Sequence, residues 1–430
     1  MKIIFENDYN NLIKQIKYHK RYLDVKDGNS LIMIEGCFQS GKTFICDLAI
    51  EKVRNDGLFD SDHIIISDLS KGTNNIGQLL PPQPDDTPYL VFLDNCRSAE
   101  MYNQVLQQLY TIKKNQVLQQ SPIKKAVIIC SYALYDSDLF YNDDGKFCVD
   151  HKNPLINRSS CLIWLIPPAR YLKLHNIPVD SVNFEKAFDD YVKYSSFPAV
   201  AVLDAENHIA RDNQLNLTCA YIMNQIVSRE ECDLNLLYDL LRIILKNIGR
   251  PLTNKKICTE LNNSFQTITK YLDILKRYSL IYECPYRDEN GAIMDSKKYY
   301  AGYTSFLHYM LDESEYPSRQ LLLENVFMTV TDLIFYKLEK PYGGVVSRSK
   351  YDFCIGLSDT LIESHDEYYS ICVVDPADKN AITCKIRPLK KIRKIIKDKV
   401  KVYLLTDDTK AFGTVNGVEV KNIYEWFLEQ

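Results

Sequence analysis

The octapeptide GCFQSGKT at residues 36–43 constrains the fold of this chain more than any other segment. Its glycines allow the backbone to wrap closely around a phosphate, with successive N–H groups pointing inward. An apolar run, LIMIE, precedes the octapeptide. A helical stretch, TFICDLAIEKV, begins at the last residue of the octapeptide. A loop between a buried strand and a helix N-terminus is a geometry that binds phosphate groups. The segment therefore predicts a P-loop that binds ATP, or a related nucleoside triphosphate, together with Mg²⁺.

Individual residues of this loop have distinct expected functions. The ammonium group of Lys42 would reach the β- and γ-phosphates, and the hydroxyl of Thr43 would bind Mg²⁺. The predicted nucleotide contacts are Gly36, Cys37, Phe38, Gln39, Ser40, Gly41, Lys42, Thr43 and Phe44.

A second part of the site is expected at the ends of other buried strands. The run YLVFLD ends in Asp94, which we predict as a metal ligand through water. The next residue, Asn95, can orient a water molecule but cannot accept its proton near neutral pH. Loss of a general base lowers a reaction rate by roughly 10²–10⁴-fold, so either another carboxylate substitutes or hydrolysis is slow. Ser131 ends the run AVIICS where a polar side chain would reach the γ-phosphate, and an ordinary strand-end serine is the alternative.

Five apolar runs alternate with helix-length segments in the first part of the chain. Unbroken apolar strands separated by helices are typical of a parallel sheet covered on both faces. We therefore expect an α/β fold, a doubly wound P-loop domain over residues 1–183, with an amphipathic lead-in over residues 1–30. The five predicted strands cover residues 31–35, 63–67, 89–94, 126–131 and 161–166.

The middle of the chain, residues 184–305, has a helical pattern that ends in a helix-turn-helix. The first of its two helices ends near Leu261, residues 262–263 form the turn, and the second helix spans residues 264–278. Two strands around a turn at residues 290–291 follow. This order of elements predicts a winged helix.

The last part of the chain, residues 306–430, reads as a second small α/β domain. A helix is expected over residues 320–338, followed by strands at YDFCIGL, YYSICVV and VKVYLLT. A basic amphipathic helix is expected over residues 389–399, before the last of these strands.

Composition narrows the location of the protein. The net charge is −4, so no chain-wide attraction to nucleic acid is implied. The 13 cysteines include no C-x-x-C pair, which disfavours a zinc site and a disulfide framework and suits a reducing cytosol. The longest strongly apolar run, residues 161–168, is too short to cross a bilayer. We expect a cytoplasmic protein with no membrane segment.

Several of these segments together resemble prokaryotic ATP-binding proteins that join an AAA-type ATPase, a winged helix and a C-terminal restriction-endonuclease-like domain of unknown function. The resemblance covers nearly the whole chain and implies Lys42 and Thr43 as nucleotide and metal contacts, Asp94 as the second acidic residue, and Ser131 as a sensor. Arg158 falls near the family's Gly-Arg position before the fifth strand, so it is either a charge-stabilising arginine or a surface arginine in a loop. The segments that carry the resemblance are, in the family's order, GCFQSGKT, LVFLDN, IICSYAL, NRSSCLIWLIPP, YVKYSSFP, LKRYSLIYECPY, LLLEN and YDFCIGL.

The chain departs from the family's pattern at two places. Asn95 replaces the family's glutamate after Asp94. In the C-terminal domain the chain keeps the family's helix glutamate and strand aspartate, Glu324 and Asp352. Cys372 and Val374 occupy the positions of the family's E-x-K pair, and neither replaces a hard-metal carboxylate or a lysine. We therefore predict a folded module for partner binding, without nuclease activity.

Three functions remain open at this point. The chain can be a nucleotide-dependent regulatory switch with weak ATPase activity, an ATP-dependent DNA-binding protein, or a scaffold that holds ATP without hydrolysing it. DNA contact would use the second helix of the winged helix, although such domains also bind proteins or act as lids. The remaining partner classes are another protein or further copies of this chain. The residues that this helix offers to DNA are Gln266, Thr267, Lys270, Lys276 and Arg277.

Overall fold

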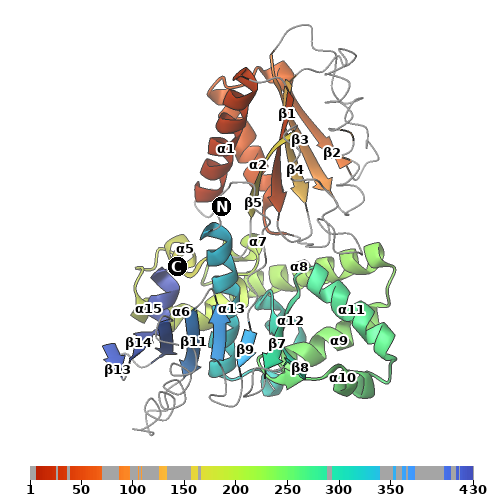
Figure 1. Cartoon of the computed structure of the whole chain (residues 1–430), viewed down its shortest axis with the longest axis vertical. Helices are drawn as coiled ribbons and strands as arrows, with labels where there is room; N and C mark the ends of the chain where they lie inside the picture. The colour runs from red at the N-terminus through yellow and green to blue at the C-terminus, as the bar shows by residue number, and fades with distance from the viewer. Residues whose placement is uncertain are drawn as a thin grey trace. The chain divides into compact units, whose positions relative to one another are not determined.

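Two compact units make up the part of the chain that the structure describes (Figure 1). The first contains the described residues up to Leu162, and the second contains those from Ile166 onward. The division into three domains at residues 183 and 305 stays a prediction. The structure is a computed structural model, and it describes residues 6–25, 28–35, 39–69, 87–96, 105, 108, 125–132, 156–162, 166–287, 293–338, 352–354, 361–364, 367–372, 401–407, 413–415 and 417–429.

The first unit is built on a five-stranded sheet in which every described pairing is parallel. The strand order is β2-β3-β4-β1-β5, so β4 lies between β1 and β3. Apolar side chains of β1, β3 and β4 are almost fully buried. The prediction of an α/β fold with a parallel sheet is confirmed. The strands are β1 (Gly28–Glu35), β2 (Ile64–Asp68), β3 (Tyr89–Cys96), β4 (Lys125–Tyr132) and β5 (Ile156–Leu162).

The fifth strand is earlier in the chain than its apolar run predicts. The apolar run predicts a strand over residues 161–166, but β5 runs from Ile156 to Leu162, and among the described strands it pairs only with β1. An edge strand has one paired neighbour and tolerates polar residues, and β5 therefore accommodates the polar sequence NRSS. Of the predicted range, residues 161–162 lie in β5, and residues 163–165 lie outside the described part of the chain.

Two helices of the first unit pack beside the sheet (Figure 1). Helix α1 (Glu6–Val25) contacts β1, β4, β5 and α2 (Lys42–Asn55), and its buried residues include Leu12, Ile16 and Leu23. The amphipathic helix expected at the N-terminus is thus confirmed. Most of residues 97–124, where the chain connects β3 to β4, lie outside the described residues. The doubly wound arrangement stays a prediction for that reason.

Helices form most of the first half of the second unit. None of the helices in the described ranges is both long and apolar enough to cross a membrane. The helices are α5 (Pro168–Leu174), α6 (Ser181–Tyr194), α7 (Pro198–Ala201), α8 (His208–Glu230), α9 (Leu234–Lys246), α10 (Asn254–Leu261), α11 (Phe265–Arg277), α12 (Ser305–Met310), α13 (Arg319–Leu338) and α15 (Ile423–Glu429).

The predicted helix-turn-helix is present. Helix α10 ends at Leu261, Asn262 follows in a left-handed conformation with φ of 49°, and α11 begins at Phe265. The hydroxyl of Ser264 caps α11 by accepting the backbone N–H of Thr267 at 3.1 Å. Asparagine tolerates a positive φ better than most residues, and serine is a preferred helix cap, so both ends of the turn follow from the sequence.

A nine-stranded sheet extends through the second unit, in the order β13-β14-β12-β11-β10-β9-β7-β8-β6. The antiparallel hairpin β7–β8 after the helix-turn-helix joins the C-terminal strands through a parallel pairing of β7 with β9, at Tyr286 and Phe353. The basic segment 389–399 lies outside the described residues. The strands are β6 (Pro251–Leu252), β7 (Ile281–Arg287), β8 (Ile293–Ala301), β9 (Asp352–Cys354), β10 (Leu361–Ser364), β11 (Glu367–Cys372), β12 (Lys401–Thr406), β13 (Gly413–Val415) and β14 (Val418–Asn422).

Helix α13 holds this hairpin by two adjacent polar side chains. The side-chain amide of Asn325 accepts the backbone N–H of Ala301 at 2.7 Å and donates to its carbonyl at 3.0 Å. Glu324 accepts a hydrogen bond from the hydroxyl of Tyr300, and the ammonium of Lys298 lies 3.5 Å from the same carboxylate. These contacts tie the edge of β8 to the helix.

Candidate functional site

The loop between β1 and α2 has the backbone alternation of an anion-binding turn. Gln39 and Gly41, two residues apart, both adopt left-handed conformations, with φ of 61° and 92°. Alternating right- and left-handed residues turn successive N–H groups toward one point, where an anion can bind. Gly41 is required here because a side chain rarely adopts this φ. Residues 36–38 of the predicted loop lie outside the described residues.

Helix α2 begins at Lys42, directly after this turn. Lys42 is 8% exposed, and its ammonium lies 3.4 Å from the hydroxyl oxygen of Ser40. A buried ammonium at a helix N-terminus creates a strongly positive environment for phosphate oxygens. Thr43, the next residue, is exposed.

Both carboxylate oxygens of Asp94 accept hydrogen bonds from neighbouring groups. The hydroxyl of Thr43 donates to Oδ2 at 2.9 Å, and the backbone N–H of Asn95 donates to Oδ1 at 2.8 Å. The first of these bonds joins residues 51 positions apart, so it brings together the two separately predicted parts of the site. Because Asp94 is held from both sides, its carboxylate has a fixed orientation at the carboxyl end of β3.

Asn95 lies in an irregular part of β3. The pairing of β3 with β4 shifts register between Leu93 and Cys96, and Asn95 has a positive φ of 57°. Such bulges re-aim side chains at functional sites, and asparagine is among the residues that adopt this φ most readily. A glutamate at this position would be strained. Asparagine in place of the expected glutamate therefore fits the backbone conformation at position 95.

Asp47 is a carboxylate near this site that the sequence analysis did not identify. It lies on α2 four residues after Thr43, and this spacing puts both residues on one face of the helix. The pKa of Asp47 is raised, first by loss of hydration and then by the negative charge of Asp94. The spacing from Thr43 is the signal in the sequence that could have identified it.

The other two predicted residues lie on strands beside β1. The backbone of Ser131 pairs with Ile34 near the carboxyl end of β4, the strand between β1 and β3. Arg158 lies within β5, opposite Leu31, so its expected position in a loop before the strand is wrong. The backbone of Arg158 is four residues, or about 13 Å, from the carboxyl edge of the sheet. The side chains of both residues lie outside the described part of the structure.

The donor atoms of this site fit a hard cation. The hydroxyl of Thr43 and the carboxylate of Asp94 are oxygen ligands, and Mg²⁺ is usually held by one or two such protein groups together with water and substrate phosphates. When bound, Mg²⁺ would neutralise charge on the phosphate oxygens. Lys42 and the backbone N–H groups would orient the phosphates.

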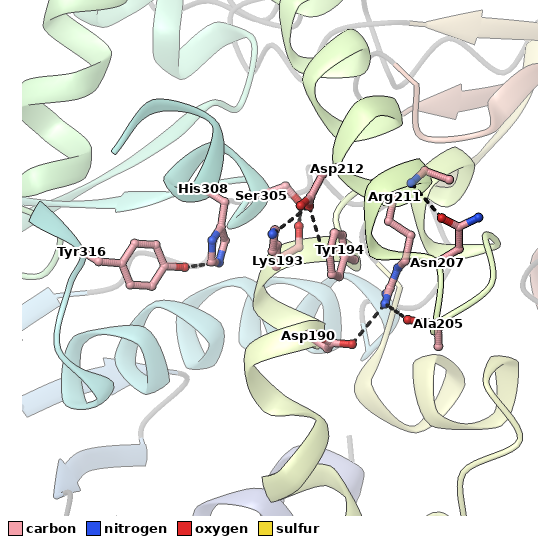
Figure 2. A network of polar contacts seen from close by, with 11 residues as sticks. Asp190, Lys193, Tyr194, Ala205, Asn207, Arg211, Asp212, Ser305, His308 and Tyr316 are labelled. Carbon is pink, nitrogen blue, oxygen red and sulfur yellow. Dashed lines mark hydrogen bonds and ion pairs between the residues drawn. The ribbon is translucent and has the colours of Figure 1, made fainter. Parts of the chain in front are cut away.

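The second unit contains a larger cluster of charges, shown in Figure 2. Arg211, fully buried in α8, donates to Asp190 at 3.1 Å and to the hydroxyl of Tyr171 at 2.6 Å. Its guanidinium also lies over the ring of Tyr194, 3.7 Å from the centroid. Beside it, Lys193 and the hydroxyl of Tyr194 both bind Asp212, at 2.7 and 2.8 Å. We call these residues, Tyr171, Asp190, Lys193, Tyr194, Arg211 and Asp212, the Arg211 network.

The Arg211 network connects helices and offers few open positions to a ligand. Its members come from α5, α6 and α8, and their charges are paired with one another. Next to it, Ser305 of α12 donates to the carbonyl of Lys193 at 2.6 Å, and His308 binds the hydroxyl of Tyr316. The network therefore fixes how these helices pack.

Glu324 and Asp352, the two residues kept from the family's nuclease pattern, differ in how they are placed. Glu324 is 1% exposed, and its carboxylate binds Tyr300 and Lys298 within the fold. Asp352 begins β9, where it pairs with Glu363. Cys372 ends β11, and Val374 lies outside the described residues.

The residues that α11 offers to a partner form two groups: those at the end of the helix are in ion pairs, and most of those near its beginning are exposed. Lys276 binds Asp273 at 2.8 Å and Glu283 at 3.4 Å, and Arg277 binds Glu230 at 2.9 Å. At the other end of the helix, Phe265 is 61% exposed, and Gln266 and Lys270 are also exposed. The exposed residues that α11 offers to a partner thus lie in its N-terminal half.

A family model and one relative each match part of this chain. Residues 185–316 match a family described as "Domain of unknown function (DUF8612)". An uncharacterized protein of Haemophilus influenzae (strain ATCC 51907 / DSM 11121 / KW20 / Rd) is 22% identical over 272 residues, which is 60% of this chain. The alignment spans 62% of the length of that relative.

Two solved structures are similar to this chain at low identity. The structure of the Aeropyrum pernix ORC1 protein in complex with DNA has a TM-score of 0.33 and 12% identity, over 75% of this chain and 93% of that chain. The structure of Drosophila ORC bound to DNA has a TM-score of 0.28 and 11% identity, over 71% of this chain and 86% of that chain. Both TM-scores are too low to establish a shared overall fold.

Proposed function

We propose that this chain binds ATP with Mg²⁺ at its P-loop and acts as a nucleotide-dependent switch with slow hydrolysis. The observation that carries the proposal is the hydrogen bond of 2.9 Å between Thr43 and Asp94. It links the helix N-terminus that would hold the phosphates to the carboxylate that would hold the metal.

Slow turnover is inferred from Asn95. Its side chain can orient water but cannot take up a proton, and its positive φ disfavours the glutamate that would do so. An enzyme with bound nucleotide and a missing base keeps the nucleotide for a long time, as a switch requires. A partner protein or a second copy of the chain would then respond to the bound state.

Binding of the fluorescent analogue mant-ATP with Mg²⁺ tests the first part of this proposal. The wild-type chain should bind it, and Lys42→Ala should weaken binding about 100-fold, since it removes charge-assisted hydrogen bonds to the phosphates. Equal binding by both proteins would contradict the P-loop assignment.

Phosphate release tests the second part. Asn95→Glu should raise the rate at least about tenfold if a base is missing, less than the full contribution of a base because the positive φ strains a glutamate. Asn95→Gly is the matched control, because glycine accepts the same φ without supplying a base. Tight ATP binding without release in every variant would instead support an ATP-bound scaffold.

A DNA-binding function is the second candidate, and the exposed half of α11 favours it. We propose that the helix-turn-helix and its hairpin form a winged helix, and that Gln266 and Lys270 meet the DNA. Lys255 and Lys256 on α10 add exposed positive charge nearby. An aromatic side chain that is 61% exposed, Phe265, is consistent with a contact surface.

The structure offers a matched pair of lysines on α11 to test this candidate. Lys270→Ala should weaken retention on duplex DNA at low salt. It should also reduce the slope of log affinity against log salt concentration by about one, the value for one lost phosphate contact. Lys276→Ala should weaken DNA retention much less than Lys270→Ala, because the Lys276 ammonium is already paired with Asp273 and Glu283. No retention of the wild-type chain at low salt would remove the DNA hypothesis.

A further inference from the structure

Two side chains of α2, Thr43 and Asp47, and one at the end of β3, Asp94, supply oxygen atoms to this part of the first unit. Thr43 and Asp47 lie one helical turn apart on α2, and residues at this spacing are neighbours on the helix surface. The Thr43 hydroxyl donates to Asp94 at 2.9 Å, so the same face of α2 is turned toward the Asp94 carboxylate. Asp47 therefore lies on the side of the helix that faces Asp94.

The two carboxylates influence each other in the absence of a cation. The negative charge of Asp94 contributes to the raised pKa of Asp47, after the loss of hydration. Placing two carboxylates near each other costs free energy, which a divalent cation between them would recover.

The position of Asp47 along α2 favours contact with the metal over activation of the attacking water. The phosphates would lie at the N-terminus of the helix, and Asp47 is four residues, or about 6 Å, farther along it than Thr43. The attacking water would approach the γ-phosphate from the side opposite its bond to the β-phosphate. Asp47 is thus closer to the Thr43 hydroxyl, where Mg²⁺ would be held, than to that water.

We propose that Asp47 is a second metal-site carboxylate, which with Thr43 and Asp94 holds Mg²⁺ through its bound water. The inference rests on the proposed nucleotide function and extends it. It gives the site two carboxylates, and a divalent ion bound to nucleotide would be held more tightly by two negative charges than by one. Nucleotide binding would then depend on the metal more strongly than in a site with one aspartate.

Metal affinity measured without turnover tests this inference. Mn²⁺ is titrated into the full chain with saturating AMP-PNP, a non-hydrolysable ATP analogue, and free Mn²⁺ is followed by electron paramagnetic resonance. Asp47→Asn should raise the apparent Mn²⁺ dissociation constant about tenfold, the effect of one charge about 6 Å from a divalent ion in water. Glu51→Gln is the matched control: Glu51 is exposed, as Asp47 is, and lies one turn farther along α2, so loss of the same charge there should change the constant by less than about twofold.

Binding of mant-ATP in the presence of EDTA separates the two proposals. Asp47→Asn should bind mant-ATP under these conditions at least as tightly as the wild type, because a negative charge near the phosphates is gone, and this result also shows that the variant is folded. If mant-ATP binds but Asp47→Asn and Glu51→Gln have the same Mn²⁺ affinity, the role of Asp47 is overturned and the nucleotide function stands. If the wild-type chain binds no mant-ATP with or without metal, both are overturned.

Discussion

The nucleotide site of the first unit and the Arg211 network of the second unit both gather charged side chains, yet they do so in opposite ways. At the site, Thr43 and Asp47 are exposed, and the negative charge of Asp94 contributes to the raised pKa of Asp47. In the network, Arg211 is fully buried and each carboxylate faces a cation. Like charges near each other favour binding of a cation, whereas opposite charges paired between helices fix the packing.

The largest effect that would test this contrast is expected from Arg211→Ala. The substitution removes a fully buried side chain and leaves the hydroxyl of Tyr171 without its partner, whereas Asp190 is 43% exposed and regains water, so the free energy of unfolding should fall by about 2–4 kcal/mol. Urea-induced unfolding followed by circular dichroism measures it. Under conditions where the variant is folded, mant-ATP affinity should be unchanged. A loss below about 1 kcal/mol would mean that the network does not determine the packing.

A second test uses pH. Burial lowers the pKa of His308 to about 4 from an ordinary value of 6.5, so the unfolded chain binds a proton between these values and the folded chain does not. The stability that depends on neutral His308 is therefore fully present above about pH 6.5, and it is lost progressively as the pH falls toward 4. This one group should account for about 2 kcal/mol at pH 4.5. His308→Asn should reduce the difference between the unfolding free energies at pH 7 and pH 4.5 by that amount. An unchanged difference would contradict the lowered pKa of His308 in the folded chain.

Thr43→Val tests the opposite side of the contrast. Because Thr43 is exposed, Asp94 can exchange its lost hydrogen bond for water, and the free energy of unfolding should change by less than about 1 kcal/mol. The affinity for mant-ATP with Mg²⁺ should fall about tenfold, since a metal ligand is gone. Thr43→Ser keeps the hydroxyl and should retain the affinity. A large loss of stability in Thr43→Val would show that the site is built for structure.

The smallest effect is expected from Arg242→Ala, a control for the burial of Arg211. Arg242 binds Asp312 at 3.1 Å and Glu315 at 2.7 Å, but it is 36% exposed. Partly exposed ion pairs contribute little, so the unfolding free energy should fall by about 0.5 kcal/mol in the same urea experiment. A loss as large as that of Arg211→Ala would show that burial does not separate the two arginines.

Local features of the sequence predicted local structure well. Strand β1, the loop and α2 follow one another as GCFQSGKT requires, and the ends of α10 and α11 lie within a residue or so of their predicted positions. Glycine at φ of 92°, asparagine at a helix end and a serine cap each express a preference of the residue itself. Asp94 was predicted because an acidic residue ended an apolar run, and the structure brings it to Thr43.

Features that depend on distant residues were not predicted. The backbone conformation of Asn95 arises from a register shift against β4, and the contact of Arg211 with Asp190 depends on the crossing of α6 and α8. Asp47 was not predicted because acidic residues are common on helices, and its relation to Asp94 depends on how α2 and β3 are placed. The start of β5 was not predicted because its first residues after Ile156 are polar, and pairing at a sheet edge does not require an apolar sequence.

The pairing of β7 with β9 has a consequence for where this chain can be divided. The matched family region ends at residue 316, but the sheet continues from Tyr286 to Phe353 beyond that point. A chain truncated after Tyr316 would lose β9 and α13, which would leave the edge of β7 open and Ala301 without its amide partner. Open strand edges pair with other chains. Such a fragment is expected to self-associate, and a soluble form of the helix-turn-helix should require the C-terminal strands.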